Sequence, residues 1–118
     1  MFIDGKAFGG KNIEKKIGKV KFSIFLLWMI SKKEQHGYEI IKTIKEDPCM
    51  PSFAASKIYP LLSDLSKKGL ISSKKVMQGK RARKIYYVTA KGKLLLEKAK
   101  DYIKKSPLMM AYVEDMLK

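Results

Sequence analysis

The sequence predicts a mainly α fold with one small β-hairpin wing (α+β). Two observations predict this class. Apolar residues recur at helical spacing along most of the chain, and one stretch rich in β-branched and aromatic residues, 84–88, follows a basic segment that contains glycine. The length of 118 residues argues for a single domain with a self-supporting core. The chain has 46% hydrophobic and 31% charged residues, which is typical of a globular protein and not of a disordered one.

The first predicted helix runs from Ile13 to Ile30 and follows a glycine-rich arm, residues 1–12. The helix is apolar nearly all round, which predicts burial on more than one side, within the fold or against another chain. Its densest apolar run begins at Phe22 and is too short to span a bilayer, which needs about 20 residues. Because the arm also lacks the apolar core of a signal peptide, we expect a cytoplasmic protein with no membrane partner.

The next two predicted helices have clear ends, and the third has a clear apolar stripe. The second helix covers residues 37–46 and ends at Asp47, because a residue that precedes proline is disfavoured in the α region. The third helix begins between residues 54 and 57 and ends at Gly69, which is typical of a C-terminal cap. Its apolar stripe has the spacing i, i+3, i+4, i+7 and consists of Ile58, Leu61, Leu62 and Leu65.

The opposite face of the third helix carries small, polar and basic side chains, and it could lie against another molecule. This face consists of Ser56, Pro60, Ser63 and Lys67, with Lys57 and Tyr59 at its flanks. Since proline donates no backbone hydrogen bond, the helix must begin shortly before Pro60 or bend there. Tyr59 is either a phosphate-contacting hydroxyl or a core ring, and its position at the flank favours the first interpretation.

A β-hairpin and further helical segments complete the predicted order. The two strands cover residues 70–76 and 84–88, and a basic tip over residues 77–83 joins them. Thr89 is a typical N-cap for the helix that follows. Ser106 and Pro107 open a final apolar helix or a kinked continuation.

The net charge of +15, from 26 basic and 11 acidic residues, indicates a polyanionic partner. Ten of the basic residues and no acidic residue lie between Leu65 and Leu96. The only arginines, Arg81 and Arg83, lie at the centre of this stretch, and the planar guanidinium matches phosphate groups and guanine edges. The alternative is a solvated basic surface, but such strong self-repulsion favours a nucleic-acid partner.

The residue types that metal binding and catalysis require are scarce. Cys49 is the single cysteine and His36 the single histidine, so neither a disulfide nor a thiolate zinc cluster can form within the chain. No paired carboxylates, nucleophile–base pair or phosphate-cradling loop can be assembled. We therefore expect no cofactor, no metal and no enzymatic activity. For His36 we expect a local hydrogen bond at the start of a helix, although a pH switch is an alternative.

Three helices, a basic hairpin and a further helix follow the order of a winged helix-turn-helix module. Three motifs make this interpretation more specific: HGYEI at 36–40, IYPLL at 58–62 with LSKKGLI at 65–71, and RARKIYYVT at 81–89. With these motifs, the sequence resembles the PadR family of bacterial and archaeal transcription regulators over about residues 20–96. The wing departs from the family's Gly-Arg-Pro-Arg-like run at Lys80 and Ala82, which stand in place of the glycine and the proline.

The resemblance implies a homodimer that binds double-stranded operator DNA, commonly as a repressor and often released by a small-molecule effector. It places Ser56, Lys57 and Tyr59 of the recognition helix, and Lys80, Arg81, Arg83 and Lys84 of the wing, near DNA. Ser63 and Lys67 extend the outward face of the same helix. A sequence-neutral, chromatin-type DNA-binding protein is the alternative function.

The apolar residues of segments 17–30 and 108–117 exceed what one small core can cover, which predicts dimerisation through the N-terminal and C-terminal helices. We accordingly expect a DNA-binding domain at residues 13–92 and a helical dimerisation region at residues 93–118. The aromatic group Phe22, Phe25 and Trp28 could line a ligand pocket between subunits, and ordinary core packing is the alternative.

Overall fold

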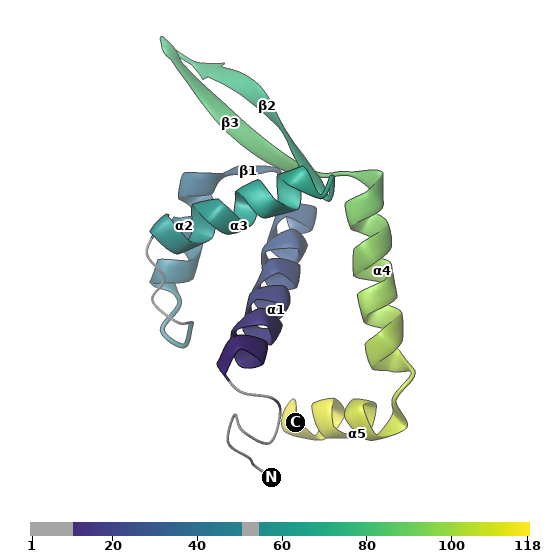
Figure 1. Cartoon of the computed structure of the whole chain (residues 1–118). Coiled ribbons are helices and arrows are strands. Elements are labelled where there is room, and N and C mark those ends of the chain that lie inside the picture. Colours follow the sequence, from purple (N-terminus) through teal and green to yellow (C-terminus); the bar gives the residue numbers. More distant parts are fainter. Residues whose placement is uncertain (1–10, 51–54) are drawn as a thin grey trace.

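The computed structural model describes residues 11–50 and 55–118, with residues 11–21 described by their backbone alone. Most of the expected arm therefore lies outside the described residues. The described chain forms α1 (Lys11–Lys32), β1 (Gln35–His36), α2 (Gly37–Glu46), α3 (Ala55–Lys67), β2 (Ile71–Gln78), β3 (Arg81–Val88), α4 (Ala90–Lys104) and α5 (Pro107–Met116). The strands form one antiparallel sheet in the order β1-β3-β2. The predicted α+β class with a β-hairpin wing is confirmed (Figure 1).

The core lies where α1, α2 and α3 meet the base of the hairpin. All four residues of the predicted α3 stripe are buried, and they pack with residues from α1, α2 and the start of β2: Leu26, Leu27, Ile30, Ile40, Ile41, Ile44 and Ile71. Figure 1 shows α3 lying across the end of α1, with the hairpin projecting away from the helices. Burial of the apolar stripe leaves the opposite face of α3 directed outward.

The end of α3 fixes the point from which the hairpin starts. The backbone N–H of Leu70 donates to the carbonyl of Leu65, and that of Gly69 donates to the carbonyl of Ser66, each at 3.0 Å. Together with a φ of 74° at Gly69, these bonds form a Schellman motif, which requires the left-handed conformation that glycine adopts without strain. The predicted glycine cap is therefore confirmed.

The last two helices begin at the predicted caps. The hydroxyl of Thr89 accepts a hydrogen bond from the backbone N–H of Gly92 at 3.1 Å, and the hydroxyl of Ser106 accepts one from Met109 at the same distance. Pro107 follows Ser106 as the first residue of α5, so the final segment is a separate helix and not a continuation of α4. Figure 1 shows α4 running alongside α1, and α5 leaving the end of α4 at a steep angle.

The hairpin is longer, and its tip shorter, than the sequence predicts. Strands β2 and β3 pair continuously from Ile71–Val88 to Gln78–Arg81, so Gly79 and Lys80 alone form the turn. The expected seven-residue tip over 77–83 is wrong because cross-strand hydrogen bonding, which needs no apolar alternation, extends through these polar residues. Gly79 has a φ of 63° and stands first in the turn, as in a type II′ hairpin.

Two further features of the described chain complete the fold. Strand β1 was not predicted, and it pairs Gln35 with Tyr86 and His36 with Ile85. Helix α1 begins at Lys11, two residues before the expected start. Within the described residues, no helix combines the length and the apolar character that crossing a membrane would require.

Candidate nucleic-acid interface

The outward face of α3 brings together the five residues that the sequence predicts for it. Ser56, Lys57, Tyr59, Ser63 and Lys67 are all exposed. Tyr59 is 46% exposed, so it is not a core ring. The helix begins at Ala55, within the predicted limits, and Pro60 stands one turn and a half further along. The result is an exposed polar face with short side chains near the start of the helix.

The predicted wing cations gather on the hairpin but divide between its two faces. Successive residues of a strand point to opposite faces, so Arg81 and Arg83 share one face of β3 whereas Lys84 belongs to the other. Lys80 lies in the turn. Lys75 stands directly opposite Lys84 in the ladder, on the same face. The wing therefore presents arginines on one face and a lysine pair on the other.

Lys75 belongs with the candidate interface, although sequence reasoning did not select it. Like charges directly opposite each other in a ladder are destabilising, and among the described residues neither Lys75 nor Lys84 forms an ion pair. Its neighbour Lys74 differs, because its Nζ lies 2.9 Å from a carboxylate oxygen of Glu34. That hydrogen bond, together with the charge of Glu34, raises the pKa of Lys74. Recognition of the two-residue glycine turn would have given the register that pairs Lys75 with Lys84.

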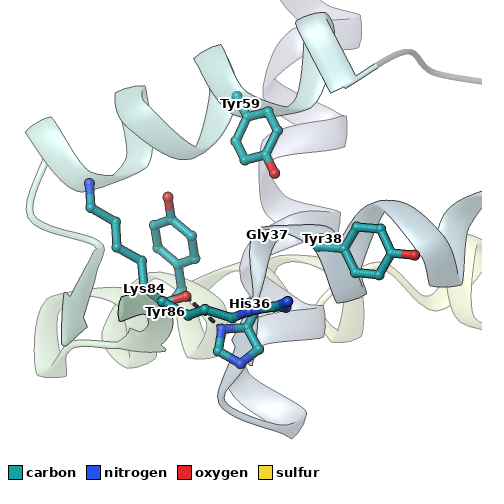
Figure 2. Close-up of a pocket in the computed structure, with 7 residues that line it drawn as sticks. His36, Gly37, Tyr38, Tyr59, Lys84 and Tyr86 are labelled. Carbon is teal, nitrogen blue, oxygen red and sulfur yellow. Dashed lines mark hydrogen bonds between the residues drawn. The ribbon is translucent and has the colours of Figure 1, made fainter. Parts of the chain in front are cut away.

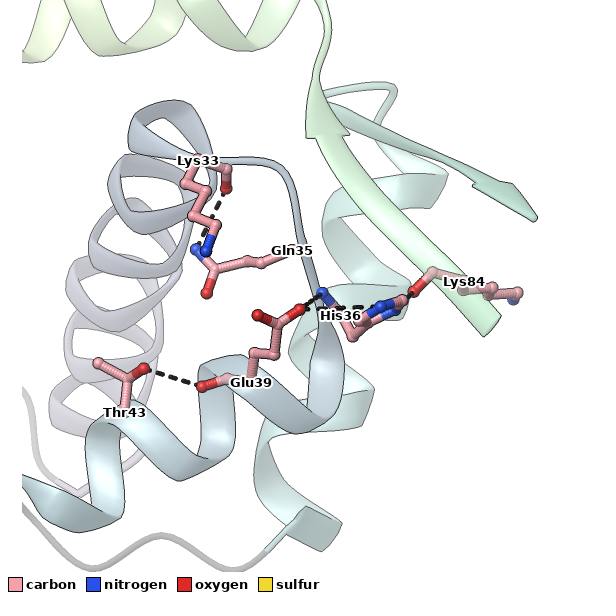
Figure 3. Close-up of polar contacts among 6 residues, drawn as sticks. All are labelled: Lys33, Gln35, His36, Glu39, Thr43 and Lys84. Atoms are coloured by element: carbon pink, nitrogen blue, oxygen red, sulfur yellow. Dashed lines mark hydrogen bonds and ion pairs between the residues drawn. The ribbon is translucent and has the colours of Figure 1, made fainter. Parts of the chain in front are cut away.

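A polar junction joins the wing to the start of α2 (Figure 3). The ring of His36 is largely buried, and its Nδ1 donates to the backbone carbonyl of Lys84 at 2.9 Å. The backbone N–H of His36 donates to a carboxylate oxygen of Glu39 at 3.0 Å. The side-chain amide of Gln35 donates to the carbonyl of Met29 at 3.0 Å. We expected a local hydrogen bond for the His36 ring. The ring instead bonds to a residue 48 positions further along the chain, and this bond ties the start of α2 to β3.

A cleft of about 210 Å³ lies between α3, the start of α2 and the wing, and we call it the α3–wing cleft. It is lined by His36, Gly37, Tyr38, Tyr59, Arg83, Lys84 and Tyr86. Figure 2 shows Tyr59 extending from α3 and Tyr86 extending from β3 into the same space. The ring of Tyr59 packs on Gly37, where a Cβ would lie 2.8 Å from the Tyr59 Cε1 atom. Glycine at position 37 therefore allows this placement of Tyr59.

Tyr86 serves both the core and the α3–wing cleft. Its ring packs against the buried core cluster. Burial raises the pKa of its hydroxyl above the ordinary value of 10.0, and the neighbouring Tyr59 raises it further. The hydroxyl is therefore a protonated hydrogen-bond donor at neutral pH.

A second, more apolar groove of about 500 Å³ lies between α1 and α4, and we call it the α1–α4 groove. Trp28 lines it and is 45% exposed, whereas Phe22 and Phe25 pack against the core. The rings of Phe22 and Phe25, and those of Phe25 and Trp28, stack with centroids 5.8 Å apart. The aromatic group is therefore divided between core packing and the groove.

Helix α5 and the end of α4 leave large apolar side chains uncovered. No residue of α5 is buried. The exposed apolar residues of this region are Tyr102, Ile103, Leu108, Met109, Tyr112, Met116 and Leu117.

In the described part of the chain, no three His, Cys, Asp or Glu side chains are placed to hold a metal ion. The chemistry that these surfaces offer is contact with anions at the wing and with apolar groups at α4 and α5.

The sequence model of the transcriptional regulator PadR-like family matches residues 26–98, which include α2, α3 and the whole wing. This chain belongs to the PadR-like family of transcriptional regulators. The exposed face of α3 and the basic hairpin are thus part of the matched PadR-like region. No curated protein matches the chain in sequence.

Solved structures of PadR-like proteins share the fold. A PadR-like transcription factor from Bacteroides fragilis superposes with a TM-score of 0.74 at 22% identity, covering 87% of this chain and 99% of that one. A PadR-like regulator from Bacillus cereus has a TM-score of 0.67 at 26% identity, with coverages of 87% and 97%. PadR from Bacillus subtilis, solved in complex with operator DNA, has a TM-score of 0.62 at 29% identity and covers 82% of this chain and 60% of its own.

Proposed function

We propose that this PadR-like chain is a sequence-specific, double-stranded DNA-binding transcriptional regulator that acts as a repressor in the cytoplasm. One observation carries the proposal: the exposed polar face of α3 lies beside a hairpin that is basic on both of its faces. The similar PadR of Bacillus subtilis, which was solved with operator DNA, supports it.

The geometry suggests that α3 and the wing contact different parts of the DNA. The short side chains Ser56 and Ser63 allow the helix axis to approach the floor of the major groove, where Lys57 can reach base edges. The wing cations would contact phosphate groups, which set position and orientation but carry no sequence information directly. Discrimination between sequences is therefore assigned to α3, and most of the non-specific affinity to the wing.

Footprinting tests this function on genomic DNA in the presence of non-specific competitor. We expect protection of preferred sites with dyad symmetry. Replacing Lys57 by alanine should erode discrimination more than non-specific affinity, since each base contact is worth about 1–3 kcal/mol. Lys45→Ala, an exposed lysine near the end of α2, is the matched control. Uniform coverage without preferred sites would refute the proposal and favour a sequence-neutral, chromatin-type protein.

We further propose that the protein is a homodimer in which residues 93–118 and α1 supply the interface and residues 13–92 bind DNA. The uncovered apolar side chains of α4 and α5 support this, because large exposed apolar patches mark interfaces. A two-fold dimer would place two α3 helices about one turn of DNA apart. Sedimentation should show a dimer that Leu108→Lys dissociates, and this 82% exposed side chain is not needed for the core. A monomer at micromolar concentration would refute the dimer.

A small-molecule effector is proposed for the α1–α4 groove. Its volume of about 500 Å³ falls within the range of about 300–1,000 Å³ that is usual for ligand pockets. Trp28 lines the groove, so an aromatic ligand bound there should change its fluorescence, and Trp28→Phe should abolish that signal. A ligand that releases DNA without affecting Trp28 would place the effector elsewhere.

A further inference from the structure

We propose that the α3–wing cleft seats one backbone phosphate of the bound duplex, held by the hydroxyl groups of Tyr59 and Tyr86 and by the cation of Lys84. The inference rests on the proposed DNA binding and names the chemical group that this cleft recognises. It assigns Tyr86 a contact with DNA in addition to its packing role. It also gives Tyr59 a contact with the DNA backbone, whereas the neighbours of Tyr59 on α3 read the bases.

The hydroxyl groups that enter the cleft are available as donors. Tyr59 and Tyr86 come from α3 and β3 and extend into one space (Figure 2). Neither hydroxyl is hydrogen-bonded to another group in the described part of the chain. A phenol hydroxyl can donate to an anionic oxygen, and the raised pKa of Tyr86 keeps its proton in place. Two donors from different elements can thus converge on one phosphate.

The charge of the cleft favours an anion. Arg83 and Lys84 line it, and no acidic side chain does. Glu39, the carboxylate of the adjoining junction, already accepts a hydrogen bond from the backbone of His36. The ring of His36 in turn donates a hydrogen bond to the backbone carbonyl of Lys84, and this bond fixes the backbone position from which the Lys84 side chain extends. Hydrogen bonds from donors to an ionised partner are shorter and stronger than those between neutral groups.

The size and place of the cleft suit a phosphate better than a larger ligand. Its volume of about 210 Å³ lies below the range of about 300–1,000 Å³ typical of drug-sized ligands. It opens between α3 and the wing, the two elements proposed to contact the major groove and the backbone. A strand that leaves the groove beside α3 would pass the mouth of the cleft before it reaches the wing. One phosphate held there would set the register of α3 on the duplex.

The experiment removes only the two hydroxyl groups, with the double variant Tyr59→Phe and Tyr86→Phe. The probe is a duplex that carries the dyad site found by footprinting, with neutral methylphosphonate introduced at one backbone position at a time. Fluorescence anisotropy should show a loss of affinity of about a hundredfold or more for the double variant on the unmodified duplex, the size expected for two hydrogen bonds to a charged group. For the unaltered protein, one position in each half-site should show a similar loss. On that modified duplex the double variant should lose nothing further.

Salt dependence separates the hydroxyl groups from the cations. The double variant removes no charge, so its slope of log affinity against log salt concentration should equal that of the unaltered protein. Lys84→Ala should make the slope shallower by about two units, because each protomer of the proposed dimer releases one fewer counterion on binding. A changed slope in the phenylalanine variant would contradict the proposed role of the hydroxyl groups.

Tyr87→Phe is the matched control, because this tyrosine lies on the face of β3 opposite to Tyr86 and does not line the cleft, so the variant should keep full affinity. Thermal unfolding verifies that the double variant is folded, and both aromatic rings remain in place to pack. If footprints persist but the double variant binds like the unaltered protein, or no methylphosphonate position is coupled to the hydroxyl groups, the phosphate seat is refuted while the proposed function stands. If the unaltered protein has no preferred site, the proposed function itself fails.

Discussion

Replacing Gly92 with alanine should destabilise the protein, because α4 begins against the backbone that links α3 to the wing. Gly92 is buried in the first turn of α4. A Cβ at this position would overlap the carbonyl oxygen of Leu70 and would lie 2.8 Å from Cγ1 of Val88. Carbon atoms in ordinary contact are about 3.5–4.0 Å apart. Because the Leu70 oxygen belongs to the backbone, a simple side-chain rotation cannot relieve the overlap.

The magnitude follows from three contributions. Overpacking costs about 1–3 kcal/mol. The Leu70 carbonyl accepts a hydrogen bond from the backbone N–H of Thr89 at 3.2 Å. It also shares the Thr89 hydroxyl, at 3.1 Å, with the Gly69 carbonyl, which lies closer at 2.6 Å, and weakening both contacts with Leu70 costs about 1–2 kcal/mol in total. Alanine recovers about 0.5–1 kcal/mol through its greater helix propensity. The net loss should be about 3 kcal/mol, which lowers the melting temperature by roughly 10 °C in a domain of this size.

Urea unfolding followed by circular dichroism measures this loss, with all variants compared at one protein concentration because a dimer unfolds in a concentration-dependent manner. Gly79→Ala is the matched control: its φ is 63°, but no atom lies within 4 Å of the added Cβ. It should cost only about 1–2 kcal/mol, from the left-handed conformation alone. A Gly92→Ala variant as stable as the unaltered protein would refute the proposed docking of α4 on Leu70.

Three further predictions concern the wing. Arg81→Ala combined with Arg83→Ala should weaken binding to all DNA sequences and reduce the salt slope by about four units, two for each protomer of the proposed dimer; an unchanged slope in anisotropy titrations would show that neither arginine contacts phosphate. Lys75→Gln should stabilise the free protein by about 0.5 kcal/mol, because it removes the like-charge pair with Lys84, and it should weaken DNA binding; a lower melting temperature would contradict this. The pKa of Tyr86 is raised on folding. The protonated hydroxyl therefore contributes fully to the free energy of unfolding below the unfolded-state pKa near 10.0, and this stabilisation is lost as the pH rises above that value. Tyr86→Phe should therefore lose less stability between pH 8 and pH 11 than the unaltered protein, and an equal loss would argue against the raised pKa.

The helices were predictable because their local signals agree with their packing. The α3 stripe from Ile58 to Leu65 is buried in full, and the caps at Gly69, Thr89 and Ser106 occupy their expected positions. Each of these signals operates within a few residues of the chain, so neighbouring sequence carries enough information to specify it.

The strands and the α3–wing cleft were less predictable because distant residues determine them. The two residues of β1, Gln35 and His36, show no alternation, and their partners Tyr86 and Ile85 lie about fifty residues further along the chain. The pairing of Gln35 with Tyr86 also brings the start of α2 to the wing. The cleft depends on that register, so its composition could not be derived from the motif around Tyr38 or from the wing sequence separately.

The distribution of ion pairs explains why the wing suits a polyanion even though its own charges repel. Lys74 pairs with Glu34 at the level where β1 joins the sheet, since Lys74 faces Ile85 and Ile85 faces His36. Between that level and the turn, no described acidic side chain pairs with the wing cations. The repulsion is only partly screened, because charges on neighbouring strands are closer than the Debye length of about 8 Å at physiological ionic strength. The backbone ladder must oppose this repulsion in the free protein, and phosphate groups would remove it. DNA binding should therefore order the outer part of the wing more than its base.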